Sequence, residues 1–411
     1  MRSEYSESFD LTNQQTKSSL GLLLISVFYV VFFPTSFRGE IITYMWMIKN
    51  LSATAIALYI TAKNKLYRKP LLTTIILLSW LAVLTITTKA LYADGDNDFH
   101  VAWAALSGFI PTLMFWCTCI KTYTIDISSA KRILHGLTIV LLIWGWGLVF
   151  QITPIVNFTY FFFSQLNDNM FNNMITIRGK PVMSFGTHSM SAFFLMLFFF
   201  LHCVEIKEGK GDYRNYIYMA LLFALVIPMR SNTAVFALAG MLVLLLWTNN
   251  THLTRIIAFA TVTVGVFFAI TQGELFDFVL SIIRSSNYMQ HGIAGRYLSG
   301  IFTNNIKIAL NYVGVGFLRS DSEVFRMNDS GIIYLFTQGN VLAVVLAYKL
   351  MYGFIKTNVR RYSLITFGVF FTWEFIATST FISVKMIFAQ VLSILIINSF
   401  CSKKEENEVY D

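Results

Sequence analysis

A stretch of 23 residues without a charged side chain decides the fold class: VMSFGTHSMSAFFLMLFFFLHCV, residues 182–204. A helix needs about 20 predominantly apolar residues to cross the hydrocarbon core of a bilayer. This stretch therefore predicts a transmembrane helix. Over all 411 residues, 56% are hydrophobic and only 13% are charged. A soluble domain carries about 25% charged residues. The composition thus excludes a soluble enzyme, a disordered chain and a typical nucleic-acid binder.

Similar apolar segments recur along the whole chain. We expect an all-α, polytopic integral membrane protein with about 12 transmembrane helices and a single membrane domain over 1–411. Two of the segments, 215–229 and 384–400, are short, so the count could differ by one or two. We expect the first helix to be retained rather than removed as a signal peptide. No internal repeat is evident in the sequence. The segments lie near 20–36, 42–61, 71–90, 101–120, 133–153, 182–204, 215–229, 232–248, 256–272, 331–353, 362–381 and 384–400.

The distribution of Lys and Arg predicts the orientation. With a cytoplasmic N-terminus, the inside segments hold 18 basic residues, whereas the short outside turns hold only Arg38, Arg230 and Lys385. Short cytoplasmic loops are enriched in Lys and Arg. We therefore expect both termini in the cytoplasm. The net charge of +9 follows from the same bias and does not require a nucleic-acid partner.

Two longer outer loops are expected, at 154–181 and 273–330. The first contains Phe158, Tyr160 and three further Phe, which suit a helix lying at the membrane interface. A structureless loop of nearly 60 residues would be unusual. The second loop is therefore expected to be a partly helical outer cap.

The presence of arginines on the outer side needs an explanation, because Lys and Arg normally accumulate in cytoplasmic loops. Each could anchor a lipid head group or pair with a nearby acid. Arg230 differs because it lies between two spans, in Pro228-Met229-Arg230-Ser231, where the chain reverses with almost no loop. A guanidinium held there fits phosphate in a bidentate manner. The outer set is Arg178, Arg230, Arg284, Arg296, Arg319 and Arg326.

Two further outer motifs could carry chemistry. Gly295-Arg296-Tyr297 begins a segment of helical apolar spacing that ends at Gly314-Val315-Gly316, so we expect an interfacial helix followed by a glycine break. A plain amphipathic surface helix is the alternative. Asp329, just before the tenth span, could be a helix N-cap or a carboxylate that takes a proton from a hydroxyl, and the two roles are compatible.

The remaining candidates are isolated polar residues. Asp94, Asp96 and Asp98 resemble the opening of a calcium-binding loop, but the Gly and bidentate Glu that such a loop needs are missing. A metal site, a catalytic acid or base, and a solvated turn all remain open for them. His188 lies at the outer end of the sixth span. Lys49 and Glu374 fall in or near the hydrocarbon, where charge is costly and often functional.

This constellation resembles the O-antigen polymerase and ligase superfamily of bacterial inner-membrane glycosyltransferases, and within it a Wzy-type polymerase. Arg178 with Phe185-Gly186-Thr187, the Met229-Arg230-Ser231 junction, and Gly295-Arg296 with Gly314-x-Gly316 carry the resemblance. The ligase His-Asn pair is replaced by Asn328-Asp329. Arg284 and Gly295 fit the R-x10-G pattern of the polymerases, whereas Arg178 does not.

The resemblance implies a donor oligosaccharide on undecaprenyl diphosphate, polymerised at the periplasmic face of the inner membrane. Arg178, Arg230, Arg284 and Arg296 would bind the diphosphate and stabilise its leaving charge. Asp329, or another outer carboxylate, would be the general base. No cofactor and no metal is required, and a chain-length regulator protein is an admissible partner.

Three other functions stay open on the sequence. A ligase to a core lipid would share the arginines and the donor. A lipid-linked oligosaccharide flippase or sugar transporter would use Lys49 and Glu374, but transporters typically have repeats and a midplane site. A membrane scaffold without activity is the last alternative.

Overall fold

The structure is a computed structural model that describes residues 20–32, 41–64, 66–91, 99–163, 180–185, 188–229, 232–248, 306–307, 310, 313–318, 331–360, 363–372 and 383–401. Over these residues it contains helices and no strand. The elements are Leu20–Phe32, α2 (Ile41–Lys63), α3 (Arg68–Leu91), α4 (Phe99–Cys117), α5 (Ile127–Val149), α6 (Thr153–Phe163), η2 (Met183–Phe185), α8 (His188–Lys207), α9 (Tyr213–Val226), η3 (Ile227–Met229), α10 (Asn232–Thr248), α16 (Gly331–Asn358), α17 (Leu364–Thr372) and α18 (Val384–Phe400).

The chain is a helical membrane protein. Four described helices are long and apolar enough to cross a bilayer: Arg68–Ala90, Ile127–Val149, Met190–Lys207 and Gly331–Asn358. Shorter apolar helices accompany them. A helix is present at each expected span except 256–272, which lies outside the described residues. The number of twelve crossings stays a prediction.

The sixth expected span begins later than its apolar run. Helix α8 starts at His188, because Met183–Phe185 form a separate 3-10 turn after Pro181. The hydroxyl of Ser191 donates a hydrogen bond to the carbonyl oxygen of Val182, which fixes this turn against the first turn of α8. An apolar run alone does not reveal such a break.

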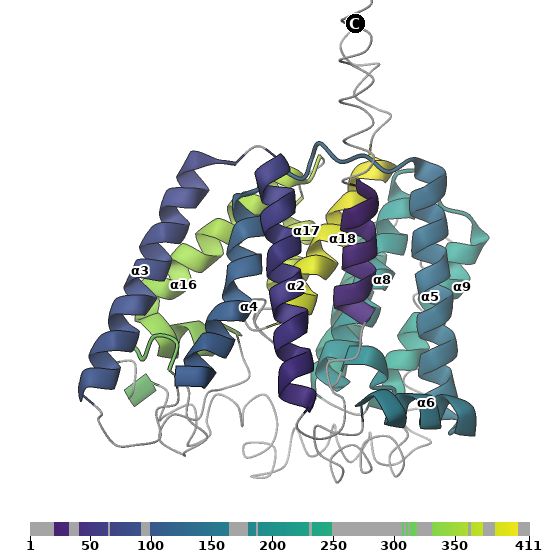
Figure 1. The fold of residues 1–411 in the computed structure, drawn as a ribbon. Coiled ribbons are helices and arrows are strands. Elements are labelled where there is room, and N and C mark those ends of the chain that lie inside the picture. Colours follow the sequence, from purple (N-terminus) through teal and green to yellow (C-terminus); the bar gives the residue numbers. More distant parts are fainter. Residues whose placement is uncertain are drawn as a thin grey trace, which may run out of the picture.

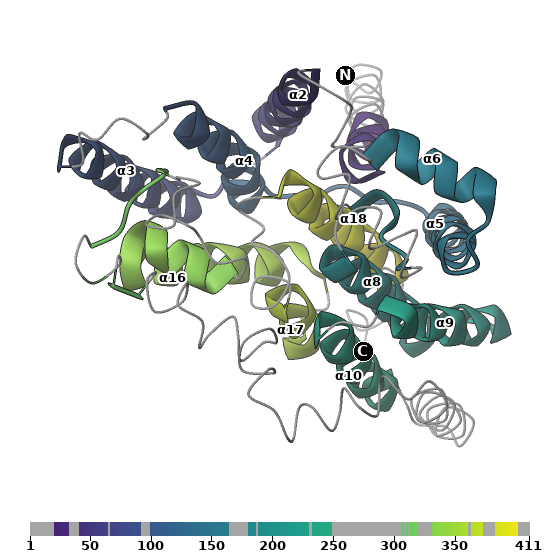
Figure 2. The same ribbon diagram turned by 90° about the horizontal axis from the view of Figure 1, so that it is seen from below.

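Helix α8 lies in the interior of the bundle and packs against α5, α9, α10 and α18 (Figure 2). Its phenylalanines from Phe193 to Phe200 are all buried. A helix that is apolar all round is expected in such a position. Helix α18 is also buried along its whole length and lies between α8 and α4. By contrast, α3 exposes Leu72, Val83 and Ile86 on its outer side, which suits contact with lipid.

One end of the bundle, at the top of Figure 1, carries many basic residues and is held together by side-chain amides that bond to backbone groups. Asn358 Oδ1 accepts from the N–H groups of Ile120 and Lys121 at 2.6 and 3.2 Å, and Asn398 Oδ1 accepts from Arg360 N–H at 2.8 Å. We call this the basic end: the α2–α3, α4–α5 and α8–α9 connections with the last turns of α10, α16 and α18. Its basic residues are Lys63, Arg68, Lys69, Lys121, Lys131, Arg132, Lys207, Lys210, Arg214, Lys356 and Arg360.

The opposite end is formed by the first turns of α8, α10 and α16, together with η2, η3 and α6. Helix α6 lies across the helix ends rather than along them (Figures 1 and 2). The indole N–H of Trp144 in α5 donates to Thr159 Oγ1 in α6 at 2.7 Å. A helix was expected here because of its aromatic residues, and its transverse course agrees with that expectation. Its location at a membrane interface stays a prediction.

Candidate functional site

The five residues expected to carry the chemistry, Arg178, Arg230, Arg284, Arg296 and Asp329, lie outside the described residues. The same holds for Glu374 and for the acidic turn of Asp94, Asp96 and Asp98. His188 is the first residue of α8. Whether the arginines and Asp329 come together therefore stays a prediction. The described residues around them define where the chain enters and leaves these segments.

The described residues next to Arg178, Arg230 and Asp329 lie at the opposite end of the bundle. Lys180 follows Arg178 by two residues and is 6% exposed, beside the 3-10 turn η2. Met229 precedes Arg230 and ends η3, and Asn232 begins α10. Gly331, two residues after Asp329, begins α16. The chain positions that flank Arg178, Arg230 and Asp329 thus share one end of the bundle (Figure 1).

A glycine turn at 313–318, within the outer loop expected at 273–330, is packed onto the bundle. Gly314 and Gly316 have φ angles of +124° and +62°, in the left-handed region that favours glycine. A Cβ atom at Gly314 would collide with the carbonyl of Gln338, and one at Gly316 with the backbone of Leu81 and Thr85. A turn is therefore present where the glycine break was expected, and both glycines are required by close contact between backbones; most of the interfacial helix expected before it lies outside the described residues.

The glycine turn packs where α16 is interrupted. Gly339 and Asn340 leave the helical conformation, and Asn340 has a φ of +58°. The carbonyl oxygens of Thr337 and Gln338 accept from the N–H groups of Val315 and Gly316 at 3.1 and 2.8 Å. An interrupted helix is tolerated in a membrane only when the freed backbone groups find partners inside the protein. The turn supplies two of them.

Helix α3 also holds the glycine turn in place. The indole N–H of Trp80 donates to the carbonyl oxygen of Gly339 at 2.9 Å, and the N–H of Phe317 donates to Thr85 Oγ1 at 2.9 Å. Thr88 Oγ1 donates to the carbonyl oxygen of Gly314 at 3.3 Å. The Phe317 ring meets the ring of Phe109 in α4 edge-on. The turn is thus held by α3, α4 and α16 together.

Gln338, at the break itself, was not singled out by its sequence context. Its side chain is 1% exposed, and neither its amide nitrogen nor its amide oxygen has a hydrogen-bond partner. A buried unsatisfied polar group costs about 1–3 kcal/mol. Each such group in a native structure calls for an explanation, and a ligand that bonds to the amide is one.

Three lysines away from the basic end are buried. Lys49 in α2 is 4% exposed, Lys180 is 6% exposed, and Lys385 in α18 is 2% exposed. The ammonium groups of Lys49 and Lys385 lie near enough to repel each other. Lys49 was expected in or near the hydrocarbon and lies within α2, whereas Lys385 was expected in an outer turn. It is instead the second residue of α18, because that helix begins inside the protein.

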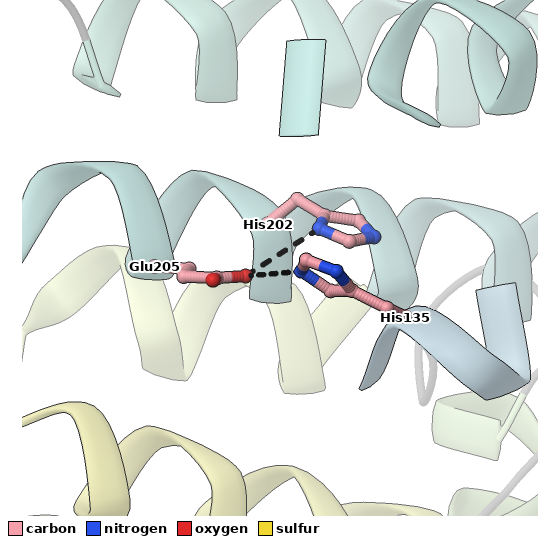
Figure 3. Close-up of side chains that lie close together, drawn as sticks. All are labelled: His135, His202 and Glu205. Atoms are coloured by element: carbon pink, nitrogen blue, oxygen red, sulfur yellow. Dashed lines mark hydrogen bonds and ion pairs between the residues drawn. The ribbon is translucent and has the colours of Figure 1, made fainter. Parts of the chain in front are cut away.

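A polar cluster at the basic end was not predicted from the sequence. His135 in α5 meets His202 and Glu205 in α8, and their nitrogen and oxygen ligand atoms all lie within 4.8 Å of one another (Figure 3). The separation of three residues between His202 and Glu205 places both on one face of a helix. That spacing was the only available signal, since His135 is 67 residues away from His202.

Comparison with known proteins adds no relative. No protein-family model matches the chain, and neither a curated protein nor a solved structure gives a significant match.

Proposed function

We propose that this protein is a membrane glycosyltransferase that polymerises lipid-diphosphate-linked oligosaccharide units at the opposite end of the bundle. One observation carries the proposal: the described residues that flank Arg178, Arg230 and Asp329 share this end. The glycine turn at 313–318, which follows Arg296 in the chain, packs against α3, α4 and the first half of α16. A single site can therefore draw on segments that are far apart in the sequence.

The chemistry assigns each group a task. The donor sugar leaves a diphosphate, and guanidinium groups at Arg178, Arg230, Arg284 and Arg296 would stabilise the negative charge that develops on it. The anomeric carbon forms a new bond to the acceptor oxygen, and the acceptor hydroxyl gives its proton to Asp329. The sugar–phosphate bond of the donor already supplies the activation, so the transfer requires no nucleotide.

The orientation proposed for this reaction places the basic end in the cytoplasm and the opposite end in the periplasm. Eleven described basic residues at one end support this, because Lys and Arg accumulate on the cytoplasmic side of inner-membrane proteins. Undecaprenyl-linked oligosaccharide would then meet the site from the outer leaflet. Helix α6, which lies across the opposite end, would rest at that interface.

The test is a complementation experiment on surface polysaccharide. Deleting the gene should leave a single repeat unit on the anchor lipid, and the intact gene should restore a ladder of longer chains. Arg230→Ala and Arg296→Ala should fail to restore the ladder while accumulating in the membrane normally. Arg214→Ala, at an exposed arginine of the basic end, is the matched control and should restore it. A full ladder from Arg230→Ala would remove that residue from the mechanism.

A lipid-linked oligosaccharide transporter is the second candidate. The interruption of α16 and the burial of Lys49 and Lys385 favour it, because interrupted helices and intramembrane charges often form transport sites. The same deletion separates the two functions. Loss of a transporter would stall the units on the cytoplasmic side, with no single unit on the anchor lipid. A ligase would instead leave polymer on the carrier lipid.

A further inference from the structure

The cluster of His135, His202 and Glu205 has the donor atoms of a metal site. His135 Nε2 lies 3.0 Å from Glu205 Oε2, and His202 Nδ1 lies 3.8 Å from the same oxygen. Zinc binds imidazole nitrogen and carboxylate oxygen at about 2.0–2.2 Å, so neighbouring ligand atoms of a tetrahedral site are about 3.3 Å apart. The three atoms, all within 4.8 Å of one another, need only small shifts to surround one ion.

Hydrogen bonds behind His202 prepare its Nδ1 as a ligand. Thr138 Oγ1 donates its proton to the carbonyl oxygen of Leu134 at 2.8 Å, so its 2.9 Å contact with His202 Nε2 requires the proton on that nitrogen. Nδ1 is then unprotonated and can bind a cation. Metal-binding histidines typically donate their second ring N–H in this way, which fixes the ring orientation.

Glu205 is also held in place by a group outside the cluster. Its side chain is fully buried, and its Oε1 lies 3.3 Å from Lys131 Nζ. Lys131 Nζ also donates to the carbonyl oxygen of Lys210. Oε2 is thereby directed toward the two imidazoles (Figure 3). Since the Lys131 side chain is 32% exposed, it can turn toward water when a divalent cation takes over the neutralisation of Glu205.

Asn215 in α9 occupies the position between the ligands. Its Nδ2 donates to Glu205 Oε2 at 2.6 Å and lies 3.0 Å from His202 Nδ1. Its Oδ1 accepts from the N–H of Asp212 at 2.9 Å, as part of the capping box of α9, so the orientation of the amide is fixed. The amide group thus bridges two acceptors that a cation could bridge instead.

We propose that His135 Nε2, His202 Nδ1 and Glu205 Oε2 form a binding site for a divalent transition-metal ion of the zinc class, in exchange with the amide of Asn215. Two histidines and one glutamate suit Zn²⁺ or Co²⁺ better than Ca²⁺ or Mg²⁺, which prefer oxygen ligands. On binding, His135 carries its proton on Nδ1, and Asn215 moves aside. The ion connects α5 to α8 at the basic end, and this role is independent of sugar transfer.

The first test is metal binding to the full-length protein in detergent. After treatment with a chelator, Zn²⁺ titrated by calorimetry should bind with one-to-one stoichiometry, and Co²⁺ should give the visible absorption of a tetrahedral nitrogen and oxygen site. His135→Ala and His202→Ala should each weaken Zn²⁺ binding by about 100-fold. His188→Ala, at the other end of the same helix, is the matched control and should bind as the unsubstituted protein does.

The second test uses Asn215→Asp and separates a metal site from a purely structural network. An aspartate can still accept the hydrogen bond from Asp212 N–H, and it offers its other oxygen as a fourth ligand. Zn²⁺ should therefore bind at least tenfold more tightly to this variant. The proposal is overturned if the unsubstituted protein binds no Zn²⁺ at micromolar concentrations, or if neither His135→Ala nor Asn215→Asp changes the affinity.

Discussion

The N–H of Gly316 donates a hydrogen bond of 2.8 Å to the carbonyl oxygen of Gln338, and this contact joins the glycine turn at 313–318 to the interruption of α16. Gly316 lies in the outer loop expected at 273–330, and Gln338 lies in a helix that is long and apolar enough to span the membrane. A change at either residue therefore tests whether the junction matters for function.

The first prediction concerns Gly316→Ala. Alanine is strained at a φ of +62°, and its Cβ would meet the backbone of Leu81 and Thr85, so the turn must separate from α3. We expect loss of polysaccharide polymer and a destabilisation of more than about 1 kcal/mol. The ladder on a gel and thermal unfolding in detergent measure the two effects. Gly353→Ala, where an added Cβ meets open space within α16, is the control and should keep the ladder without destabilising the protein.

The second prediction concerns Gln338→Leu. Leucine has a similar volume and removes two unsatisfied polar atoms, so the free energy of unfolding should rise by about 1–3 kcal/mol. Polymer yield should nevertheless fall, if the amide bonds to substrate. Gln151→Leu, at an exposed glutamine, is the comparison. Unchanged polymer in a stabilised Gln338→Leu protein would mean that the amide has no part in the reaction.

The third prediction concerns Asn358→Ala at the basic end. The substitution leaves the buried N–H of Ile120 without its 2.6 Å acceptor and removes the donor to the carbonyl oxygen of Thr118. An unsatisfied buried group costs about 1–3 kcal/mol, so thermal unfolding should occur at a clearly lower temperature. Since this residue is distant from the proposed site, polymer should still form at permissive temperature. A loss of polymer with unchanged stability would contradict this assignment.

The positions of the helices could be predicted because the length of an apolar run is a local property. The apolar stretch at 182–204 predicted a helix, and Gly314 and Gly316 predicted a break in the chain. Each prediction needed only neighbouring residues. The interruption of α16 could not be predicted in this way. Its freed carbonyls are satisfied by Val315, Gly316 and Trp80, and nothing near Gly339 in the sequence indicates that those partners exist.

For the candidate sites too, local features could be predicted from the sequence, whereas contacts between distant residues could not. The location of Lys49 within a helix followed from its place in an apolar run, whereas the burial of Lys385 depends on where α18 begins. The pairing of His135 with Glu205 depends on the packing of α5 against α8, two helices whose paired residues are 70 positions apart. A single sequence contains no signal for contacts over such distances, so the convergence of Arg178, Arg230 and Arg296 likewise remains a prediction.

The fourth prediction concerns Lys49→Met. A buried ammonium group in a membrane span is costly, and Lys49 also repels Lys385, so methionine should raise the unfolding temperature. If the lysine pair binds an anionic group of the substrate, activity should fall although stability rises. Lys69→Met, at the basic end, is the control. Full activity together with higher stability would show that Lys49 is dispensable and would weaken the transporter alternative.

The fifth prediction tests the orientation by labelling single cysteines with a membrane-impermeant maleimide. In a protein with Cys401 replaced by serine, the remaining native cysteines, Cys117, Cys119 and Cys203, are buried and should react slowly. Asn157→Cys, exposed on α6, should be labelled in intact spheroplasts, whereas Thr122→Cys, exposed at the basic end, should require permeabilised membranes. The reverse pattern would put the basic end outside. It would remove the proposed site from the leaflet that holds the lipid-linked donor, and the polymerase proposal would fail with it.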